Sequence, residues 1–182
     1  MTVDLKRARI LARLQGIDFK VRELVDEWLL VTYDLPSTPE GNEVRSKFLK
    51  LAPQIGAVMH TRSVYLMPLT NETQAAAVEL SKIGNVFVWT SKANDQQFAR
   101  QLTRLYDSRI ENSIDTINSR IKKILVHIDK GHFKRASSMY DKTVDKFNDA
   151  VFSAIQRGNG SIYNELCTLR SSLDTLKSDV GE

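Results

Sequence analysis

The chain has 182 residues, of which 42% are hydrophobic and 26% charged, and its formal net charge is +4. This balance is typical of a folded globular protein and excludes a disordered chain. No apolar run reaches the roughly 18–20 residues that a bilayer-spanning helix needs, and the N-terminus has no apolar signal core, so we expect a cytoplasmic protein without a membrane partner. The single cysteine, Cys167, excludes an intrachain disulfide and a zinc site built from several thiolates.

Residues 1–26 are predicted to form a basic amphipathic helix that precedes the main domain. Apolar residues recur there at alternating intervals of four and three, which places them on one face of a helix: Ile10, Leu14, Ile17, Val21 and Leu24. Five basic residues of this segment could neutralise the phosphates of a nucleic acid: Lys6, Arg7, Arg9, Arg13 and Lys20. The alternative is that these side chains form the solvated face of the helix.

Residues 27–93 alternate between strand and helix patterns. The first strand is the apolar run Glu27–Pro36, a hairpin over Ala57–Pro68 follows the first helix, and the last strand is Val86–Trp89. Strands that bracket two helices in this order fold most simply as a four-stranded antiparallel sheet with both helices on one face. The sequence therefore predicts the α+β class and, within it, a ferredoxin-like βαββαβ sandwich.

Both helices of this region have predicted capping residues. Thr38 precedes Pro39, an N-cap followed by proline at the first helical position. Asn71, with Gln74 three residues later, resembles a capping box at the start of the second helix.

Residues 94–182 are predicted to be helical throughout and to form a helical hairpin or bundle. Glycines at Gly131 and Gly158–Gly160 separate three long amphipathic segments, which indicates antiparallel neighbours packed within one chain or across a dimer. The apolar seams are Ile110, Ile114, Ile117, Ile121, Ile124 and Ile128; then Tyr140, Val144, Phe147, Val151 and Ile155; then Ile162, Leu166, Leu169, Leu173, Leu176 and Val180. A second basic run flanks the first break: Arg120, Lys122, Lys123, Lys130, Lys134 and Arg135.

Asp34 is the sharpest candidate for a chemical site. A carboxylate at the end of an apolar strand has to be hydrogen-bonded, exposed in the adjoining loop or bound to a cation. The alternative is that Asp34 caps the turn that follows it, as aspartate often does. One aspartate per chain could hold Mg²⁺ or Mn²⁺ only if symmetry brought two copies face to face.

The hairpin adds His60, a possible acid or base near neutral pH, and Tyr65. The alternative for His60 is a solvent-facing position on a strand. The three histidines, His60, His127 and His132, share no metal-ligand spacing, and there is no glycine-rich phosphate loop or nucleophile elbow. We therefore expect no cofactor.

Three stretches, Leu29–Pro36, Asn42–Ile55 and Gly56–Pro68, resemble two known groups of proteins. One is the N-terminal domain of the chromate-resistance regulator ChrB, and the more distant one is the small CRISPR-associated adaptation endoribonuclease family. The resemblance implies a ferredoxin-like fold and a homodimer. In the nuclease members of the second family the aspartate that ends the first strand is a metal ligand, and Asp34, after Tyr33, occupies the matching position.

Three readings of the function follow. The first is a noncatalytic, homodimeric regulator or scaffold that contacts DNA or RNA through its basic residues; beyond the N-terminal segment these are Arg62, Lys122 and Lys123. The second is a nuclease that depends on Mg²⁺ or Mn²⁺ bound by Asp34, with His60 and Tyr65 nearby. The third is a protein-interaction module that docks through helices 102–128 and 162–180.

Overall fold

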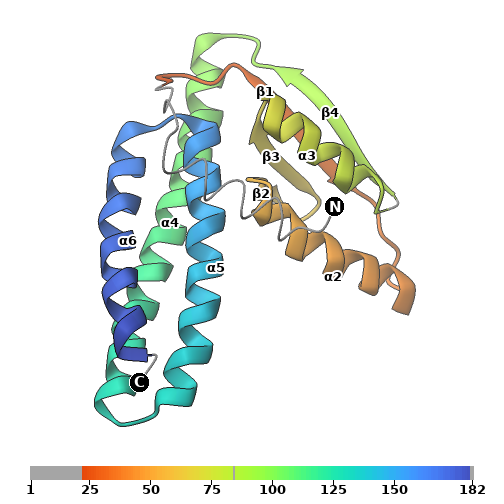
Figure 1. Ribbon diagram of the computed structural model, residues 1–182. Helices are drawn as coiled ribbons and strands as arrows, with labels where there is room; N and C mark the ends of the chain where they lie inside the picture. The colour runs from red at the N-terminus through yellow and green to blue at the C-terminus, as the bar shows by residue number, and fades with distance from the viewer. Residues whose placement is uncertain (1–21, 84, 181–182) are drawn as a thin grey trace.

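The computed structural model describes residues 22–83 and 85–180 (Figure 1). Most of the predicted N-terminal helix lies outside these residues, and so do Lys6, Arg7, Arg9, Arg13 and Lys20. Its last part, residues 22–26, is described and forms neither helix nor strand. The Arg22 N–H donates to the Gly158 carbonyl at 2.9 Å, and the carbonyl of Arg22 accepts from the Arg157 side chain at 2.6 Å. These tertiary bonds use backbone groups that a helix would pair internally.

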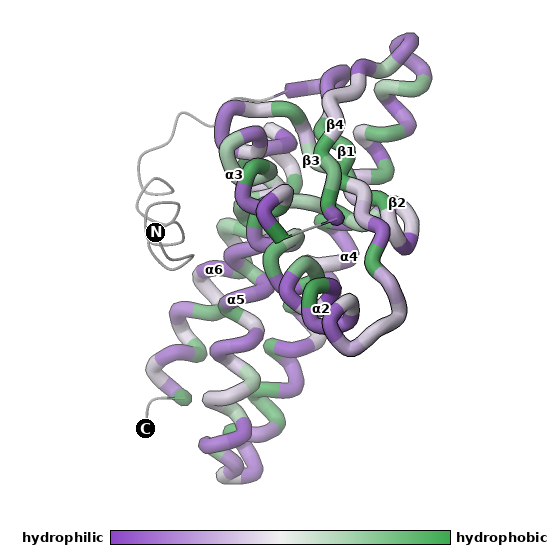
Figure 2. Tube along the Cα trace, turned by 90° about the vertical axis from the view of Figure 1, so that its right-hand side faces the viewer, coloured by the Kyte–Doolittle hydropathy of each residue, from purple (hydrophilic) through white to green (hydrophobic). Residues whose placement is uncertain are grey.

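The fold is mixed α+β with a four-stranded antiparallel sheet, as predicted. The first part of the chain contains, in order, β1 (Glu27–Tyr33), α2 (Pro39–Gln54), β2 (Val58–Thr61), β3 (Val64–Pro68), α3 (Asn71–Ser81) and β4 (Val86–Lys92). The strand order in the sheet is β2-β3-β1-β4, so β2 and β4 are the edge strands. Both neighbours of β1 run antiparallel to it, as does β2 to β3. Hydrophobic residues fill most of β1 and β3 in Figure 2.

The helix starts show one correct and one wrong capping assignment. Thr38 caps α2 as predicted, since its side-chain oxygen accepts from the Gly41 N–H at 3.1 Å. For α3, however, the cap is Thr70 rather than Asn71. The Thr70 oxygen accepts from the Thr73 N–H at 3.1 Å, and the Thr73 hydroxyl accepts from the Thr70 N–H at 2.9 Å. This reciprocal box begins the helix one residue earlier in sequence than the predicted pair would.

The second part of the chain is a bundle of three long helices, α4 (Gln96–Asp129), α5 (Phe133–Arg157) and α6 (Gly160–Val180). The breaks are where the glycines predict them, and Gly158 ends α5 in the left-handed conformation at φ 70°. Most seam residues, among them Ile110, Ile117, Leu166 and Leu173, are buried within the chain. The seams therefore pack against one another inside one molecule, and this answers the choice between bundle and dimer that the sequence left open.

The two faces of the sheet have different neighbours. One face carries Leu29, Val31 and Tyr33 of β1, and the Tyr33 ring lies 4.7 Å from Phe48 of α2. Figure 1 shows α2 and α3 side by side over this face. The opposite face carries Trp28, whose ring lies 5.7 Å from Tyr106 of α4. The sheet and the bundle thus share one hydrophobic core.

No helix in residues 22–83 or 85–180 is both long and apolar enough to cross a membrane.

Candidate nucleic-acid interface

A cavity near the tip of the α4–α5 hairpin is lined mainly by cations. Its volume is about 390 Å³, and its lining residues are Arg120 and Lys123 of α4 with Arg135, Ser138, Met139 and Lys142 of α5. Four of these six side chains carry a positive charge and none carries a negative one. Such a cavity favours an anion, because the cations repel one another until a counter-charge enters.

A second cavity of about 450 Å³ lies between the hairpin and the sheet. Two residues of β2, Val58 and Met59, form its wall on the sheet side. The helices contribute two cations, Arg109 and Lys146, and one carboxylate, Asp149. Most of its other helical lining consists of short polar side chains: Asn112, Ser113, Thr116 and Ser153.

The two cavities lie on the same side of the hairpin. On α4 their lining positions are 109, 110, 112, 113, 116, 120 and 123, and on α5 they are 135, 138, 139, 142, 146, 149, 150 and 153. Steps of three and four residues keep a stripe on one side of a helix, so the cavities are one helical turn apart. We call this surface the basic groove and define it by its six cations: Arg109, Arg120, Lys123, Arg135, Lys142 and Lys146.

The basic groove is long and electrostatically one-sided. From residue 109 to residue 123 the stripe on α4 extends over about 21 Å, at 1.5 Å per residue. The six cations face a single lining carboxylate, Asp149. The Arg120 Nη1 donates to the Lys142 carbonyl at 3.1 Å, which fixes the guanidinium across the two helices and leaves other N–H donors for a ligand.

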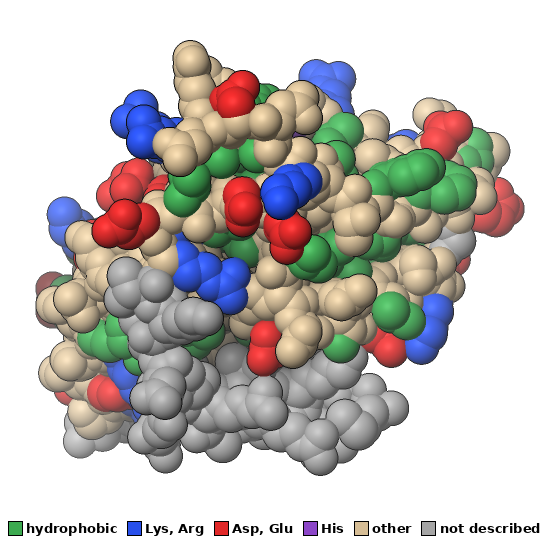
Figure 3. Space-filling view, turned by 90° about the horizontal axis from the view of Figure 1, so that it is seen from above, with side chains coloured by type: hydrophobic (Ala, Val, Ile, Leu, Met, Phe, Trp, Pro, Cys, Tyr) green, Lys and Arg blue, Asp and Glu red, His purple; other side chains and the backbone are tan. Residues whose placement is uncertain are grey.

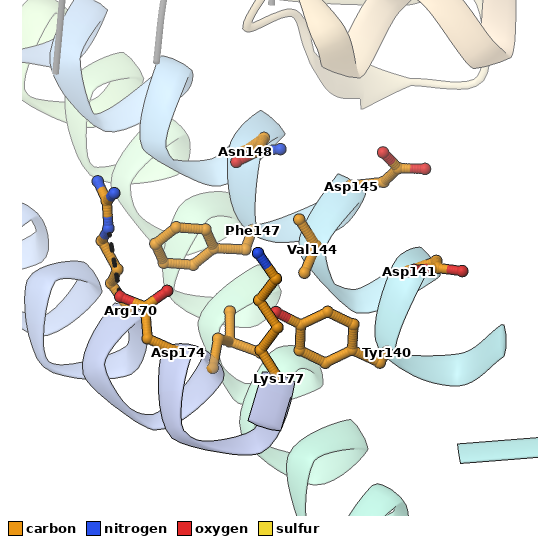
Figure 4. A pocket seen from close by; sticks show the side chains of 10 residues that line it. Tyr140, Asp141, Val144, Asp145, Phe147, Asn148, Arg170, Asp174 and Lys177 are labelled. Atoms are coloured by element: carbon orange, nitrogen blue, oxygen red, sulfur yellow. Dashed lines mark ion pairs between the residues drawn. The ribbon is translucent and has the colours of Figure 1, made fainter. Parts of the chain in front are cut away.

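The other side of α5 has the opposite character. A cavity of about 400 Å³ between α5 and α6 contains three carboxylates, Asp141, Asp145 and Asp174, against Arg170 and Lys177 (Figure 4). Figure 4 shows Arg170, Asp174 and Lys177 on α6 and the Tyr140 and Phe147 rings on α5, and it marks the ion pair between Arg170 and Asp174. Seen from above, in Figure 3, Lys and Arg side chains alternate with Asp and Glu. Of these three cavities, only the two that make up the basic groove have more lining cations than lining carboxylates.

Two histidines, His127 and His132, lie close together at the tip of the α4–α5 hairpin. The rings of His127 and His132 are 5.9 Å apart. Desolvation lowers the pKa of His127, and the positive charges of Arg135, His132 and Lys130 lower it further. Its Nδ1 is buried without a hydrogen-bond partner. Desolvation is the larger cause of the lowered pKa, and only the smaller contribution of the neighbouring positive charges also favours an anion at the tip.

The basic residues predicted from the sequence are partly brought together. Lys123 lines the groove, together with Arg120 and Arg135 of the second basic run. Its neighbour Lys122 is also exposed but is not part of the lining. Arg62 is exposed in the turn between β2 and β3, where its carbonyl accepts the Tyr33 hydroxyl at 2.6 Å.

Three groove cations, Arg109, Lys142 and Lys146, were missed by the sequence analysis. The signal that could have found them is the helical spacing itself. Lys142 and Lys146 are four residues apart, and Arg109 precedes Arg120 by eleven residues, close to three full turns.

The residues proposed for catalysis have unlike surroundings. Asp34 is exposed beyond the end of β1, where its N–H donates to the Asn85 carbonyl at 3.2 Å. His60 is exposed on β2. Tyr65 is buried under α2, with its ring 4.9 Å from Phe48, and burial raises its pKa with a smaller contribution from Tyr33. Among the described residues, no three His, Cys, Asp or Glu side chains are placed to hold a metal ion.

The comparisons with known proteins return no relative. The chain matches no family model, no curated protein and no solved structure. The resemblance of Leu29–Pro36, Asn42–Ile55 and Gly56–Pro68 to the ChrB and CRISPR adaptation families therefore gains no support from these comparisons.

Proposed function

We propose that this protein is a noncatalytic nucleic-acid-binding regulator or scaffold whose basic groove contacts the phosphate backbone of DNA or RNA. The observation that carries the proposal is the placement of six cations and one carboxylate on a single stripe about 21 Å long. A polyanion with regularly spaced charges matches such a stripe better than a small anion does. Each neutralised phosphate releases counterions, which favours binding at low salt.

The fold supports this role without specifying it. The strand order β2-β3-β1-β4 and the antiparallel pairing of β1 with both neighbours agree with a ferredoxin-like sandwich. We propose that arrangement for residues 27–93, with the helical bundle as the nucleic-acid-binding extension. A homodimer stays a prediction, because the apolar seams that suggested it are buried inside one chain.

The other two readings have less support. The buried Tyr65 and the exposed Asp34 and His60 do not share one environment. Most seam residues of helices 102–128 and 162–180 are buried within the chain, so the seams are not free to dock a partner. Cleavage that requires Mg²⁺ or Mn²⁺ and is lost in Asp34→Asn would favour the nuclease.

The test compares two double charge reversals that change the net charge equally. Lys123→Glu with Lys142→Glu alters the groove, and Lys122→Glu with Lys177→Glu alters exposed lysines outside it. Each pair lowers the formal net charge from +4 to 0, because each reversal removes two charges. Fluorescence anisotropy of a labelled oligonucleotide, measured over a salt series, gives the affinity and its salt dependence.

The groove variant should bind more weakly, and the slope of log K against log salt should become shallower by about 2 for duplex DNA. The control variant should keep most of the affinity and the slope of the unmodified protein. Equal losses in both variants would mean that only net charge matters, and they would overturn the assignment to the groove. No binding by the unmodified protein at low salt would overturn the function itself.

A further inference from the structure

Part of the sheet face opposite α2 and α3 is open within the described part of the chain. Five uncharged side chains lie there, as the strand register shows: Leu30 and Thr32 of β1, Val64 of β3, and Phe87 and Trp89 of β4. Phe87 and Trp89 are 53% and 56% exposed. Two large adjacent aromatic side chains at this exposure are unusual for a surface without a partner. We call these five residues the aromatic platform.

The platform is held in a defined orientation. The Trp89 indole N–H donates to the Thr32 hydroxyl on the neighbouring strand at 3.1 Å. The Phe87 and Trp89 rings are 6.5 Å apart and inclined by 35°. Because the indole edge is bonded to the sheet, its ring does not have to be immobilised when a flat ligand stacks on it, which lowers the entropic cost of binding.

The aromatic platform adjoins the basic groove across the sheet. Trp89 is in register with Leu30, Leu30 with Leu66, and Leu66 with Val58. Val58 also lines the cavity that contains Arg109 and Lys146. Three strand spacings separate Val58 from Trp89, which amounts to about 14 Å along one face of the sheet. This separation is short enough for one extended ligand to contact both surfaces, although the ligand has to pass around Leu66, which is buried between them.

We propose that the aromatic platform stacks unpaired bases of a single-stranded nucleic acid whose phosphates follow the basic groove. This inference rests on the proposed function and names the form of nucleic acid that the protein prefers. The platform carries no charge and presents aromatic rings, while the adjoining groove carries the cations, so bases and phosphates each meet a matching surface. Every base offers a flat face for stacking, whereas a duplex keeps its bases stacked on one another.

The test uses the full chain with a single-stranded oligonucleotide and a duplex, each about 15 nucleotides long. DNA and RNA versions of the single strand form separate arms. Trp89→Ala removes the platform, Trp89→Phe keeps an aromatic ring, and Leu49→Ala is the control, since Leu49 is 46% exposed on α2 at the other face. Anisotropy gives the affinities. Tryptophan fluorescence reports Trp89 directly, because Trp28, the second tryptophan, is buried.

Trp89→Ala should weaken single-strand binding by about tenfold and leave duplex binding unchanged. Trp89→Phe should restore most of the affinity, and Leu49→Ala should have no effect. Single strands, and not the duplex, should quench Trp89 in the unmodified protein. Thermal unfolding midpoints establish that the variants fold.

The failure of this inference is distinguishable from the failure of the proposed function. If groove reversals weaken binding and Trp89→Ala does not, the function stands and the platform has no part in it. If no nucleic acid binds, both fail. If acrylamide cannot reach Trp89 in the free protein, the platform is already covered. Shielding that grows with protein concentration would identify a second copy of the chain as the occupant, and either result overturns the inference.

Discussion

Arg157 and Asp107 form a buried ion pair that joins the end of α5 to α4. The Arg157 Nε lies 2.8 Å from Asp107 Oδ1, and Nη2 donates to Oδ2 at 3.1 Å. The two side chains are only 4% and 16% exposed. Arg157 also binds the carbonyl of Arg22, and Asn159 donates to Asp107 Oδ2 at 3.1 Å. This network anchors the chain that enters β1 to the bundle.

Replacing Asp107 should strongly destabilise the protein. Asp107→Ala leaves the Arg157 guanidinium buried without a counter-charge, and the loss of one partner of such a pair typically lowers the free energy of unfolding by about 3–5 kcal/mol. Urea denaturation measures the change. The double variant Asp107→Leu with Arg157→Met should cost less than the single one, because no unpaired charge remains. A double variant as unstable as the sum of the single variants would contradict this account.

Two glycines with left-handed backbones should respond differently to alanine. Gly56 and Gly131 have φ values of 76° and 70°. A Cβ at Gly56 would lie 3.1 Å from Phe152 and 3.3 Å from the Tyr106 hydroxyl, whereas a Cβ at Gly131 would meet nothing within 4 Å. Gly131→Ala should therefore cost only the conformational term of about 1–2 kcal/mol. Gly56→Ala should cost more, and equal unfolding free energies would show that the contacts yield without strain.

The hydroxyl of Tyr106 should contribute to the free energy of unfolding in addition to its ring. Its hydroxyl donates to the Gly56 carbonyl at 2.6 Å in the core, and burial raises its pKa well above the ordinary value, so it remains a donor at alkaline pH. Tyr106→Phe keeps the contact with Trp28 and leaves the carbonyl of Gly56 unpaired, at a cost of about 1–3 kcal/mol. Chemical denaturation measures it. The control is Tyr163→Phe on the partly exposed side of α6, where water can replace the interaction of its hydroxyl with Cys167, so stability should change far less.

His127 should couple nucleic-acid binding to pH. Desolvation and nearby positive charges lower its pKa in the folded protein, so the unfolded chain binds more protons between that lowered pKa and the ordinary value of 6.5. The stability contributed by neutral His127 is therefore fully present above pH 6.5, and it is lost as the pH falls through the lowered pKa of the folded protein. A polyanion bound at the tip should raise the pKa of His127, so binding takes up protons and tightens as the pH falls below 6.5.

The measurement is an NMR titration of the His127 imidazole with and without a saturating oligonucleotide. His127→Gln should bind with a weaker pH dependence than the unmodified protein. If the pKa of His127 is the same in both titrations, the nucleic acid does not approach the tip.

The amino-acid sequence by itself determined the order of the elements, their approximate ends and the apolar seams. These follow from local periodicity and from residues such as Thr38 and Gly158, whose preferences act within one turn of chain. It did not separate Thr70 from Asn71 as a cap, because neighbouring polar residues offer similar oxygens and the tertiary path of the chain selects one.

Only the tertiary structure decided which basic residues lie together. Lys122 and Lys123 are equivalent in sequence, yet one helical step of 100° places Lys123 in the groove and Lys122 outside it. Arg109 and Lys146 meet because α4 and α5 run antiparallel, and the exposed side of Trp89 depends on which face of the sheet α2 and α3 cover. These are properties of packing between segments distant in the chain, and a local pattern cannot encode them.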